Sequence, residues 1–251
     1  MLENLKKKKL ATIILAAGKG TRMHSDLAKV LHLLRGKPML SYPVALAREM
    51  GSQIIVIIVG HQSDLIRNTI KGEDLVFIEQ KEQLGTGHAV LQASETLQNF
   101  EGETLILCGD IPLLMPSTVD ALLESHSLCH ASVTVLTTIM DDPTGYGRIV
   151  RGKGNAVLKI VEERDATEEE KGIREINSGI YCVESKFLFE SVGQIDNNNA
   201  QEEYYLTDIL EIAGRMGCKT NSFSVHNHIE VMGINTREDL ERADRIMEKM
   251  K

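Results

Sequence analysis

The stretch IILAAGKGTRM, residues 13 to 23, is the place where the fold is first readable, because an apolar run ends there in a bare, cationic turn. Two alanines and a glycine leave the backbone open, and Lys19 and Arg22 add positive charge. A strand that runs into such a turn is typical of a loop that holds phosphate groups. Close packing of neighbouring elements also requires small residues at 16 to 18, and this second explanation stays open.

Two common phosphate-binding loops do not fit this stretch. The dinucleotide fingerprint requires a third glycine, and Met23 stands at its position after Gly18 and Gly20. The acidic residue expected after the next strand is also missing, because the apolar run at 54–59 continues into Gly60 and His61. The P-loop pattern matches no stretch of the chain. The loop therefore belongs to neither class.

Strand-like and helix-like segments alternate on both sides of this loop. Residues 11–16 and 54–59 are continuous apolar runs, as expected for parallel strands that are buried on both faces. Between them we expect a helix that Ser41 caps and that has Pro43 in its first turn. Repeated βα units predict an α/β, Rossmann-like fold with a mainly parallel sheet flanked by helices. The other elements expected in this half are strands at 75–78 and 104–108 and helices at 62–70, 87–98 and 116–129.

After about residue 131 the pattern becomes richer in β-structure. A turn at 152–155 separates two apolar segments, 148–150 and 156–161, which predicts a hairpin. The charged residues 162–171 predict a solvated loop or a short helix. The chain closes with a helix from Thr236. The remaining expectations are strands at 133–136 and 176–183 and an apolar stripe of Leu240, Ala243, Met247 and Met250 on the last helix.

Composition excludes several classes of protein. The 251 residues carry a formal net charge of -8 without a basic stripe, which argues against nucleic acid as a partner. No apolar run reaches the length of a membrane span. The four cysteines form no C-x-x-C pair, which is typical of reduced thiols in a cytoplasmic protein. Lys6 to Lys9 and the following apolar run superficially resemble a signal peptide, but that run is short and leads straight into the glycine-rich loop.

Two further loops follow strands at the edge where such sheets bind ligands. In EQKEQLGTGH, residues 79 to 88, Gln80 and Gln83 offer the donors and acceptors that reading a base edge requires. In CGDIP, residues 108 to 112, Asp110 ends a strand with a carboxylate that suits Mg²⁺. The alternatives are a polar loop that caps the next helix and an aspartate that starts a turn. His126 and His130 lack a third ligand and are expected on a surface helix face.

Eight motifs occur in order between about residues 11 and 240: LAAGKGTRMHSDLAKVLH, EQLGTGHA, GDIPLL, DDPTGYGRI, VEERDA, EINSGIY, NNNAQEEYYLTD and EVMGIN. Together they resemble the sugar-nucleotide pyrophosphorylase family, and within it the uridylyltransferase domain of the bacterial bifunctional N-acetylglucosamine-1-phosphate uridyltransferase and glucosamine-1-phosphate acetyltransferase. Eight motifs in register are far more specific than any one of them. No hexapeptide repeats follow, so acetyl transfer is not expected of this chain.

The resemblance implies a role for each matching residue. The opening loop would wrap the triphosphate of UTP, and Mg²⁺ would be the cofactor. Arg22, Lys29 and Asp110 would be catalytic, and Asp110 and Asn235 would hold the metal. The nucleotide would contact Leu15, Ala16, Ala17, Gly18, Lys29, Gln80, Gln83, Gly85 and Thr86, with Cys108, Gly109 and Asp110 beside it, and the N-acetyl sugar would contact Gly147, Glu162, Asn177, Tyr205 and Thr207. Asn235 would also be a substrate-binding residue.

The implied activity is the synthesis of UDP-N-acetylglucosamine, a cell-wall precursor, and pyrophosphate from UTP and N-acetylglucosamine-1-phosphate. Both partners are small molecules; neither nucleic acid nor membrane is expected, and the sequence indicates no oligomeric state. The sugar phosphate is already ionised at pH 7, so the chemistry needs no general base.

The implied fold is of the nucleotide-diphospho-sugar transferase type. We expect one domain over 1–251, with a nucleotide-binding part at about 10–130, a small β-rich sugar-binding part at about 131–235 and a C-terminal helix at 236–251.

Three residues depart from the family pattern: Ala28 replaces a proline, Cys108 a tyrosine and Glu202 a glycine. They leave open a different sugar or nucleotide in the same reaction. A non-catalytic nucleotide-sugar sensor is the alternative of another class, although Arg22, Lys29, Asp110 and Asn235 are all present.

Overall fold

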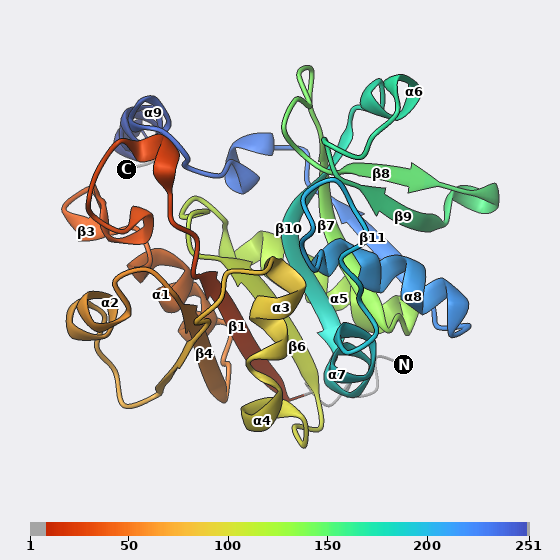
Figure 1. Ribbon diagram of the computed structural model, residues 1–251, viewed down its shortest axis with the longest axis horizontal. Coiled ribbons are helices and arrows are strands. Elements are labelled where there is room, and N and C mark those ends of the chain that lie inside the picture. The colour runs from red at the N-terminus through yellow and green to blue at the C-terminus, as the bar shows by residue number, and fades with distance from the viewer. Residues whose placement is uncertain (1–8, 250–251) are drawn as a thin grey trace.

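The computed structural model describes residues 9–249, and Figure 1 shows a central twisted sheet with helices on both faces. The sheet has nine strands, and its main path runs in the order β11-β7-β10-β6-β1-β4-β5. Strands β6, β1, β4 and β5 are parallel, whereas β10 runs antiparallel to both of its neighbours. This confirms the predicted mainly parallel α/β fold. The strands of the main path are β1 (Leu10–Ala16), β4 (Ile54–Val59), β5 (Leu75–Glu79), β6 (Glu103–Cys108), β7 (Val133–Ile139), β10 (Glu175–Glu184) and β11 (Thr220–Ser224).

The two faces of the sheet are covered by different helices. Along β1, Ile14 packs on the side of α1, α2 and α5, whereas Ile13 packs on the side of α3, α4, α7 and α8. Successive strand residues point to opposite faces, so burial on both faces produces the continuous apolar runs seen in the sequence. The helices are α1 (Ser41–Glu49), α2 (Ser63–Thr69), α3 (Thr86–Leu91), α4 (Ser94–Leu97), α5 (Pro116–Cys129), α6 (Glu168–Lys171), α7 (Ser185–Val192), α8 (Ile209–Arg215) and α9 (Arg237–Lys249).

The direction of chain winding reverses at β1. This strand pairs with β4 on one side and with β6 on the other, so the chain leaves β1 toward one edge of the sheet and leaves β6 toward the opposite edge. A crevice opens between the carboxyl ends of two strands at such a switch point, and ligands of open α/β sheets bind there. The glycine-rich loop and the Gly109–Asp110 turn both lie at this point.

The predicted hairpin forms beside the main sheet. Strands β8 (Arg148–Arg151) and β9 (Val157–Val161) pair antiparallel, and Arg148 also pairs with Ile176 of β10. Strands β7, β10 and β11 belong to the same sheet as β1 and β4. The division into a nucleotide-binding part and a sugar-binding part stays a prediction.

Two local expectations were wrong. Ser41 is the first residue of α1, and the N-cap position falls on Leu40, whose side chain cannot accept a hydrogen bond. The single helix expected at 87–98 is divided into α3 and α4. The cause is a tightened turn: the amide of Ala93 donates to the carbonyl three residues earlier, on Val90, and the side chain of Gln92 donates to a backbone carbonyl of α3.

The C-terminal helix α9 packs against a short ribbon formed by β2 (Leu33–Leu34) and β3 (Lys37–Pro38), and Figure 1 shows the two side by side at one end of the molecule. Ala243 is fully buried there, with Leu240 and Met247 partly buried, and Arg35 forms an ion pair with Asp244 at 3.1 Å. The fourth residue of the predicted stripe, Met250, lies outside the described residues. Within 9–249, every helix is too short or too polar to cross a lipid bilayer.

Candidate active site

A cavity of about 560 Å³ opens at the carboxyl ends of β1 and β6. Its walls come mainly from three loops that are far apart in sequence, which are the glycine-rich loop with the segment up to Val30, the 79–88 loop and the turn after β6, and Glu203 adds to them. Most of the residues predicted to contact the nucleotide therefore share one cavity. Those that line it are Leu15, Ala16, Ala17, Gly18, Lys29, Gln80, Gln83, Gly85, Thr86, Cys108 and Asp110, together with Lys19, Val30, Ala89 and Glu203.

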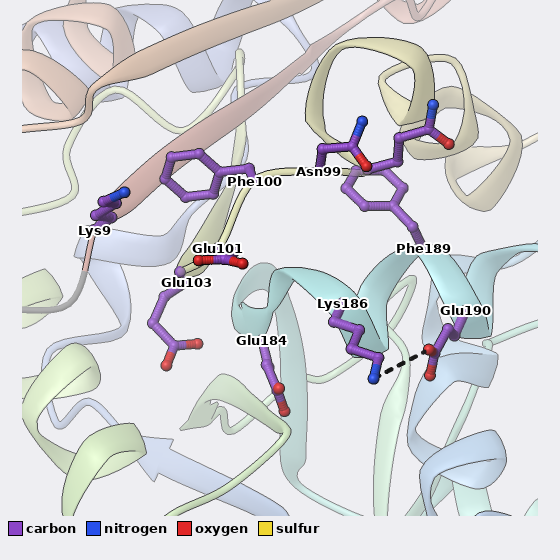
Figure 2. Close-up of a pocket in the computed structure, with 11 residues that line it drawn as sticks. Lys9, Asn99, Phe100, Glu101, Glu103, Glu184, Lys186, Phe189 and Glu190 are labelled. Carbon is purple, nitrogen blue, oxygen red and sulfur yellow. Dashed lines mark ion pairs between the residues drawn. The ribbon is translucent and has the colours of Figure 1, made fainter.

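A larger hollow, of about 1100 Å³, lies at the opposite end of the sheet (Figure 2). Lys9 and Glu103 place it at the amino ends of β1 and β6, and Glu184 and Lys186 line it from the end of β10 and the start of α7. Topology favours the smaller cavity as the ligand site, because open α/β sheets bind at the carboxyl ends of their strands.

The glycine-rich loop is held closed by backbone conformation and by α9. Gly20 has a φ of 62°, and a Cβ there would lie 2.5 Å from the Cβ of Lys29. Met23, which occupies the place of a third glycine, is fully buried and anchors the loop. The guanidinium of Arg237 donates to the carbonyls of Met23 and His24, each at 3.3 Å. The buried side chain of Met23 thus holds the end of the loop in place, and residues 15–19 at its start line the cavity.

Four predicted phosphate and metal residues converge on one point. The ammonium of Lys29 lies 2.5 Å from Oδ2 of Asp110 and donates to Oδ1 of Asn235 at 3.1 Å. Arg22 donates to the same amide oxygen at 2.8 Å. Asn235 reaches this point because the amide of Ile234 donates to the carbonyl of Asp110 at 2.9 Å. A carboxylate and an amide oxygen that share one cation are donors that also suit Mg²⁺, so these residues fit a divalent ion.

The 79–88 loop presents its amides on a rigid support. Gln80 is buried, and its side chain donates to the carbonyl of Gly85 at 3.0 Å and lies 3.0 Å from Nδ1 of His88. Gly85 has a φ of 109°, and a Cβ there would lie 2.6 Å from the carbonyl oxygen of Tyr204. Only glycine fits this position, and its absent side chain lets the loop approach the 203–206 segment. The sequence predicted the glycine but gave no signal for Tyr204.

A second glycine, Gly60, makes room for the side chain of Gln83, and the sequence did not predict this role. A Cβ at Gly60 would lie 2.8 Å from Nε2 of Gln83 and 2.6 Å from the carbonyl oxygen of Ala17. The side-chain amide of Gln83 therefore lies over a bare backbone next to the glycine-rich loop. A glycine after a strand is a common turn signal, so its pattern does not reveal this role.

The predicted sugar residues form a neighbouring cluster: Gly147 directly precedes β8, Glu162 directly follows β9, and Asn177 lies on β10. A Cβ at Gly147 would lie 3.4 Å from Oε2 of Glu162, and the amide of Asn177 donates to the carbonyl of Gly147 at 2.9 Å. Oδ1 of Asn177 accepts hydrogen bonds from the amide of Gly179 at 2.9 Å and from the hydroxyl of Tyr181 at 3.0 Å. These two bonds fix the orientation of the Asn177 amide.

Tyr205 and Thr207 complete this cluster through hydrogen bonds to acidic and amide groups. Thr207 donates to Glu162 at 3.3 Å, and burial raises the pKa of that carboxyl despite this bond. The hydroxyl of Tyr205 donates to Asp165 at 3.2 Å and accepts from Gln201 at 2.8 Å. Tyr205 is thus buried, and hydrogen bonds hold its hydroxyl to the adjacent loops.

Cys108 and Gly109 connect the two groups of residues. The Cys108 thiol lines the predicted nucleotide cavity and donates to the carbonyl of Gly179 at 3.4 Å. Burial raises the pKa of this thiol to about 12, so it is neutral at pH 7 and unsuited to nucleophilic attack. The amide of Gly109 donates to the carbonyl of Leu15 at 2.9 Å, which holds the β6 turn against the glycine-rich loop.

Two further side chains differ from the expectations of the sequence analysis. His126 is buried, not on a surface face: its ring nitrogens lie 2.9 Å from Glu103 and 2.9 Å from Thr134. Tyr146 was not among the predicted site residues. Burial raises the pKa of its hydroxyl, and the charges of Asp239 and Asp110 raise it further.

A glycine-rich loop, two cations and a carboxylate at the switch point of an α/β sheet characterise proteins that handle phosphorylated ligands. Residues 11–227 match the model of the nucleotidyl transferase family, and the chain belongs to that family. The fold agrees with a solved UDP-glucose pyrophosphorylase in complex with UDP-glucose, with a TM-score of 0.77 at 18% identity over 97% of this chain and 99% of that one.

The similar curated proteins include two that carry the name bifunctional protein GlmU. The protein from Geobacter metallireducens is 53% identical over 237 residues, and the one from Geotalea daltonii is 52% identical over 242 residues. These matches cover 94% and 95% of this chain but 50% and 52% of the relatives. The chain therefore spans about half the length of the curated relatives that it matches.

Proposed function

We propose that this chain is a uridylyltransferase that makes UDP-N-acetylglucosamine and pyrophosphate from UTP and N-acetylglucosamine-1-phosphate. The observation that carries the proposal is the cluster of Arg22, Lys29, Asp110 and Asn235 beside the nucleotide cavity. Membership of the nucleotidyl transferase family supports it, as do the eight motifs that resemble a uridylyltransferase domain. The four free thiols fit the cytoplasmic location expected from the sequence.

The chemistry asks the protein to bring two anions together and to stabilise the leaving pyrophosphate. The attacking oxygen belongs to a phosphate that is ionised at neutral pH, so no side chain has to remove a proton. Lys29 and Arg22 would neutralise phosphate charge, and the backbone of residues 15–18 would hold the nucleotide in line. A bound Mg²⁺, held by Asp110 and Asn235, would supply further positive charge at the reacting phosphates.

Selection of the base would fall to the 79–88 loop. The buried amide of Gln80 is fixed by Gly85 and His88, so it meets a base edge with little freedom to adapt. Cytosine reverses donor and acceptor at two edge positions relative to uracil and would leave polar groups unpaired. Each mismatch costs roughly 1–3 kcal/mol, so we expect CTP to be used at least about tenfold less well than UTP.

Selection of the sugar would fall to Asn177 and Glu162. Gly179 and Tyr181 hold Oδ1 of Asn177 and so fix the orientation of its side-chain amide. We expect the NH₂ group of this amide to donate to the acetamido substituent of the sugar. Glu162 would accept a hydrogen bond from a sugar hydroxyl. Glucosamine-1-phosphate brings an ammonium in place of the acetamide, and glucose-1-phosphate brings a hydroxyl. We expect both to be poor substrates.

A second candidate keeps the reaction but changes the sugar, and Cys108 is the observation that favours it. The thiol lies where the related enzymes carry a tyrosine, and it borders both the nucleotide cavity and the Gly179 turn. Glu202 does not add to this case. Its φ is 54°, in the left-handed region that favours the family's glycine, and its side chain is exposed.

A pyrophosphate-release assay with and without Mg²⁺ tests the proposal. The chain would be incubated with each of the four nucleoside triphosphates in combination with N-acetylglucosamine-1-phosphate. The proposed function predicts metal-dependent release with UTP and little with the others. Release with CTP in preference to UTP would show that the 79–88 loop is misinterpreted, and no release with any pair would contradict the proposal.

A further inference from the structure

A buried arginine stands at the start of the hairpin that carries the predicted sugar residues. Arg148 is 1% exposed, and its guanidinium lies 2.6 Å from Oε2 of Glu163. The same guanidinium donates to the carbonyl of Tyr146, and Oε2 of Glu163 also accepts from the amide of Gly145 at 3.0 Å. This ion pair and its hydrogen bonds therefore join the loop before β8, at Gly145 and Tyr146, to Glu163 in the segment after β9.

Each member of this pair is the direct neighbour of a predicted sugar residue. Gly147 precedes Arg148, and Glu162 precedes Glu163. The two sugar residues face each other, since a Cβ at Gly147 would lie 3.4 Å from Oε2 of Glu162. Any change in the separation of the pair would therefore move these two contacts relative to each other.

The carboxyl of Glu162 needs such support because its surroundings oppose its charge. Burial disfavours the ionised form, and the carboxylates of Asp165 and Asp208 repel it. A side chain in this position gains by moving toward water. The adjacent ion pair resists that movement, because breaking it would leave the buried guanidinium of Arg148 without its carboxylate.

We propose that Arg148 and Glu163 are positioning residues that hold Gly147 and Glu162 at the spacing required by the sugar phosphate. The inference rests on the proposed function, since it assigns the pair to the sugar side of that reaction. It predicts an effect on the sugar phosphate and none on the nucleotide, whose cavity is lined by other loops.

The chain offers a matched control on the same strand. Arg151, at the other end of β8, forms a two-point ion pair with Glu175, with distances of 2.7 Å and 2.5 Å. This pair is also partly buried, but Arg151 ties the far end of β8 to β10 and β11 through Glu175 and Ser222. Glu163→Gln and Glu175→Gln therefore make the same chemical change to the carboxylate partners of the two arginines at the ends of β8.

The test measures steady-state kinetics of pyrophosphate release for the wild type and both variants. Glu163→Gln is expected to raise the KM for N-acetylglucosamine-1-phosphate by about tenfold, within the range for a lost hydrogen bond to a charged group. The KM for UTP and kcat should stay within about twofold of the wild type. Glu175→Gln should leave all three constants within about twofold, even if both variants lower Tm.

Glu163→Asp keeps the charge but shortens the side chain, and it replaces the glutamine variant if that protein fails to fold. It is expected to show a smaller rise in the same KM. Equal constants in the Glu163 and Glu175 variants, or an equal rise in the KM for UTP, would contradict the positioning role alone. A wild-type chain that releases no pyrophosphate would instead contradict the proposed function.

Discussion

Lys29 takes part in both functions proposed for the site, which are metal binding and the neutralisation of phosphate charge. Its ammonium is shared by Asp110 and Asn235, so a divalent cation at those oxygens has to compete with it. Lys29→Gln should therefore bind Mn²⁺ at least about tenfold more tightly than the wild type in the absence of nucleotide, as measured by electron paramagnetic resonance. The same variant should lose turnover, because phosphate charge is less neutralised.

Lys19→Gln is the control for this prediction, because Lys19 lies in the same loop and lines the same cavity. It should leave the Mn²⁺ affinity unchanged within about twofold. If Lys29→Gln and the wild type bound Mn²⁺ equally, competition between the ammonium and the metal would be refuted.

Asp110 should be indispensable if it holds the metal. Asp110→Ala is expected to lower kcat by about a thousandfold, which corresponds to roughly 4 kcal/mol of activation free energy. Asp141→Ala, which removes an exposed carboxylate, should have little effect. Full activity of Asp110→Ala in saturating Mg²⁺ would remove this carboxylate from the mechanism.

At this scale, the sequence predicted side chains better than it predicted their supports. Asp110 could be found because it directly follows a buried strand at the edge where ligands bind. Asn235 came only from the family resemblance, since a backbone bond from Ile234 brings it to Asp110 across the fold. Tyr204 and Arg237 carry no local signal, because both act through backbone groups of distant loops.

At the scale of elements, the loop before Lys29 has an unusual clamp. Ala28 stands where the family has proline, with φ near the proline value at -51°. Its amide donates to Oε1 of Gln62 at 2.8 Å, and the side chain of Gln62 donates to the carbonyl of Asp26 at 2.7 Å. Gln62 thus supplies, through hydrogen bonds, the rigidity that a proline ring would give covalently.

This clamp predicts a coupling between two residues far apart in sequence. Gln62→Ala should raise the KM for UTP by about three- to tenfold, because ordering the loop then costs part of the binding energy. In an Ala28→Pro background, which lacks the Ala28 amide and is rigid at that residue, the same change should have a smaller effect. Kinetics of the wild type, the two single variants and the double variant give the coupling, and strictly additive effects would contradict it.

The elements that the sequence revealed are those whose burial leaves a pattern. Strands β1 and β4 are buried on both faces, and their apolar runs were found within one residue of their ends. Strand β11 has the polar sequence TNSFS, so it was missed; it is a strand because it pairs with β7 in parallel register. The division of the 87–98 helix depends on one tightened turn, and the amino-acid pattern of this segment does not predict that turn.

At the scale of the whole molecule, the acidic residues near the predicted sugar site should make the free energy of unfolding depend on pH. Burial, with added repulsion from Asp196 and Glu211, raises the pKa of Asp208 from 3.8 to about 6. The folded chain therefore keeps this proton to higher pH than the unfolded chain does. The contribution of Asp208 to the free energy of unfolding consequently falls as pH rises from about 4 to about 6.

Asp208→Asn removes this penalty and should raise Tm at pH 7 relative to the wild type, while the difference should vanish near pH 4. Asp120→Asn, at an exposed position of α5, is the control and should show no such pH-dependent difference. Thermal unfolding at several pH values measures both. A constant difference between Asp208→Asn and the wild type over this range would contradict the raised pKa.

The arrangement of the whole sheet would allow one chain to bind the two proposed substrates side by side. The predicted nucleotide cavity lies at the β1–β6 switch point, and three of the predicted sugar residues lie just before the start of β8, after the end of β9 and on β10 of the same sheet. Cys108 borders both, so the two substrates would meet over the end of β6. The alternating apolar segments predicted this sheet, but the antiparallel placement of β10, which brings the sugar side next to β6, required the structure.

The most direct test of this account is a competition reaction in one vessel. The chain, Mg²⁺ and UTP would be mixed with equal concentrations of N-acetylglucosamine-1-phosphate, glucosamine-1-phosphate and glucose-1-phosphate, and the nucleotide sugars formed would be quantified by mass spectrometry. We predict UDP-N-acetylglucosamine as the dominant product, at least about tenfold above the other two. A predominance of UDP-glucose, or the absence of any nucleotide sugar, would contradict the account.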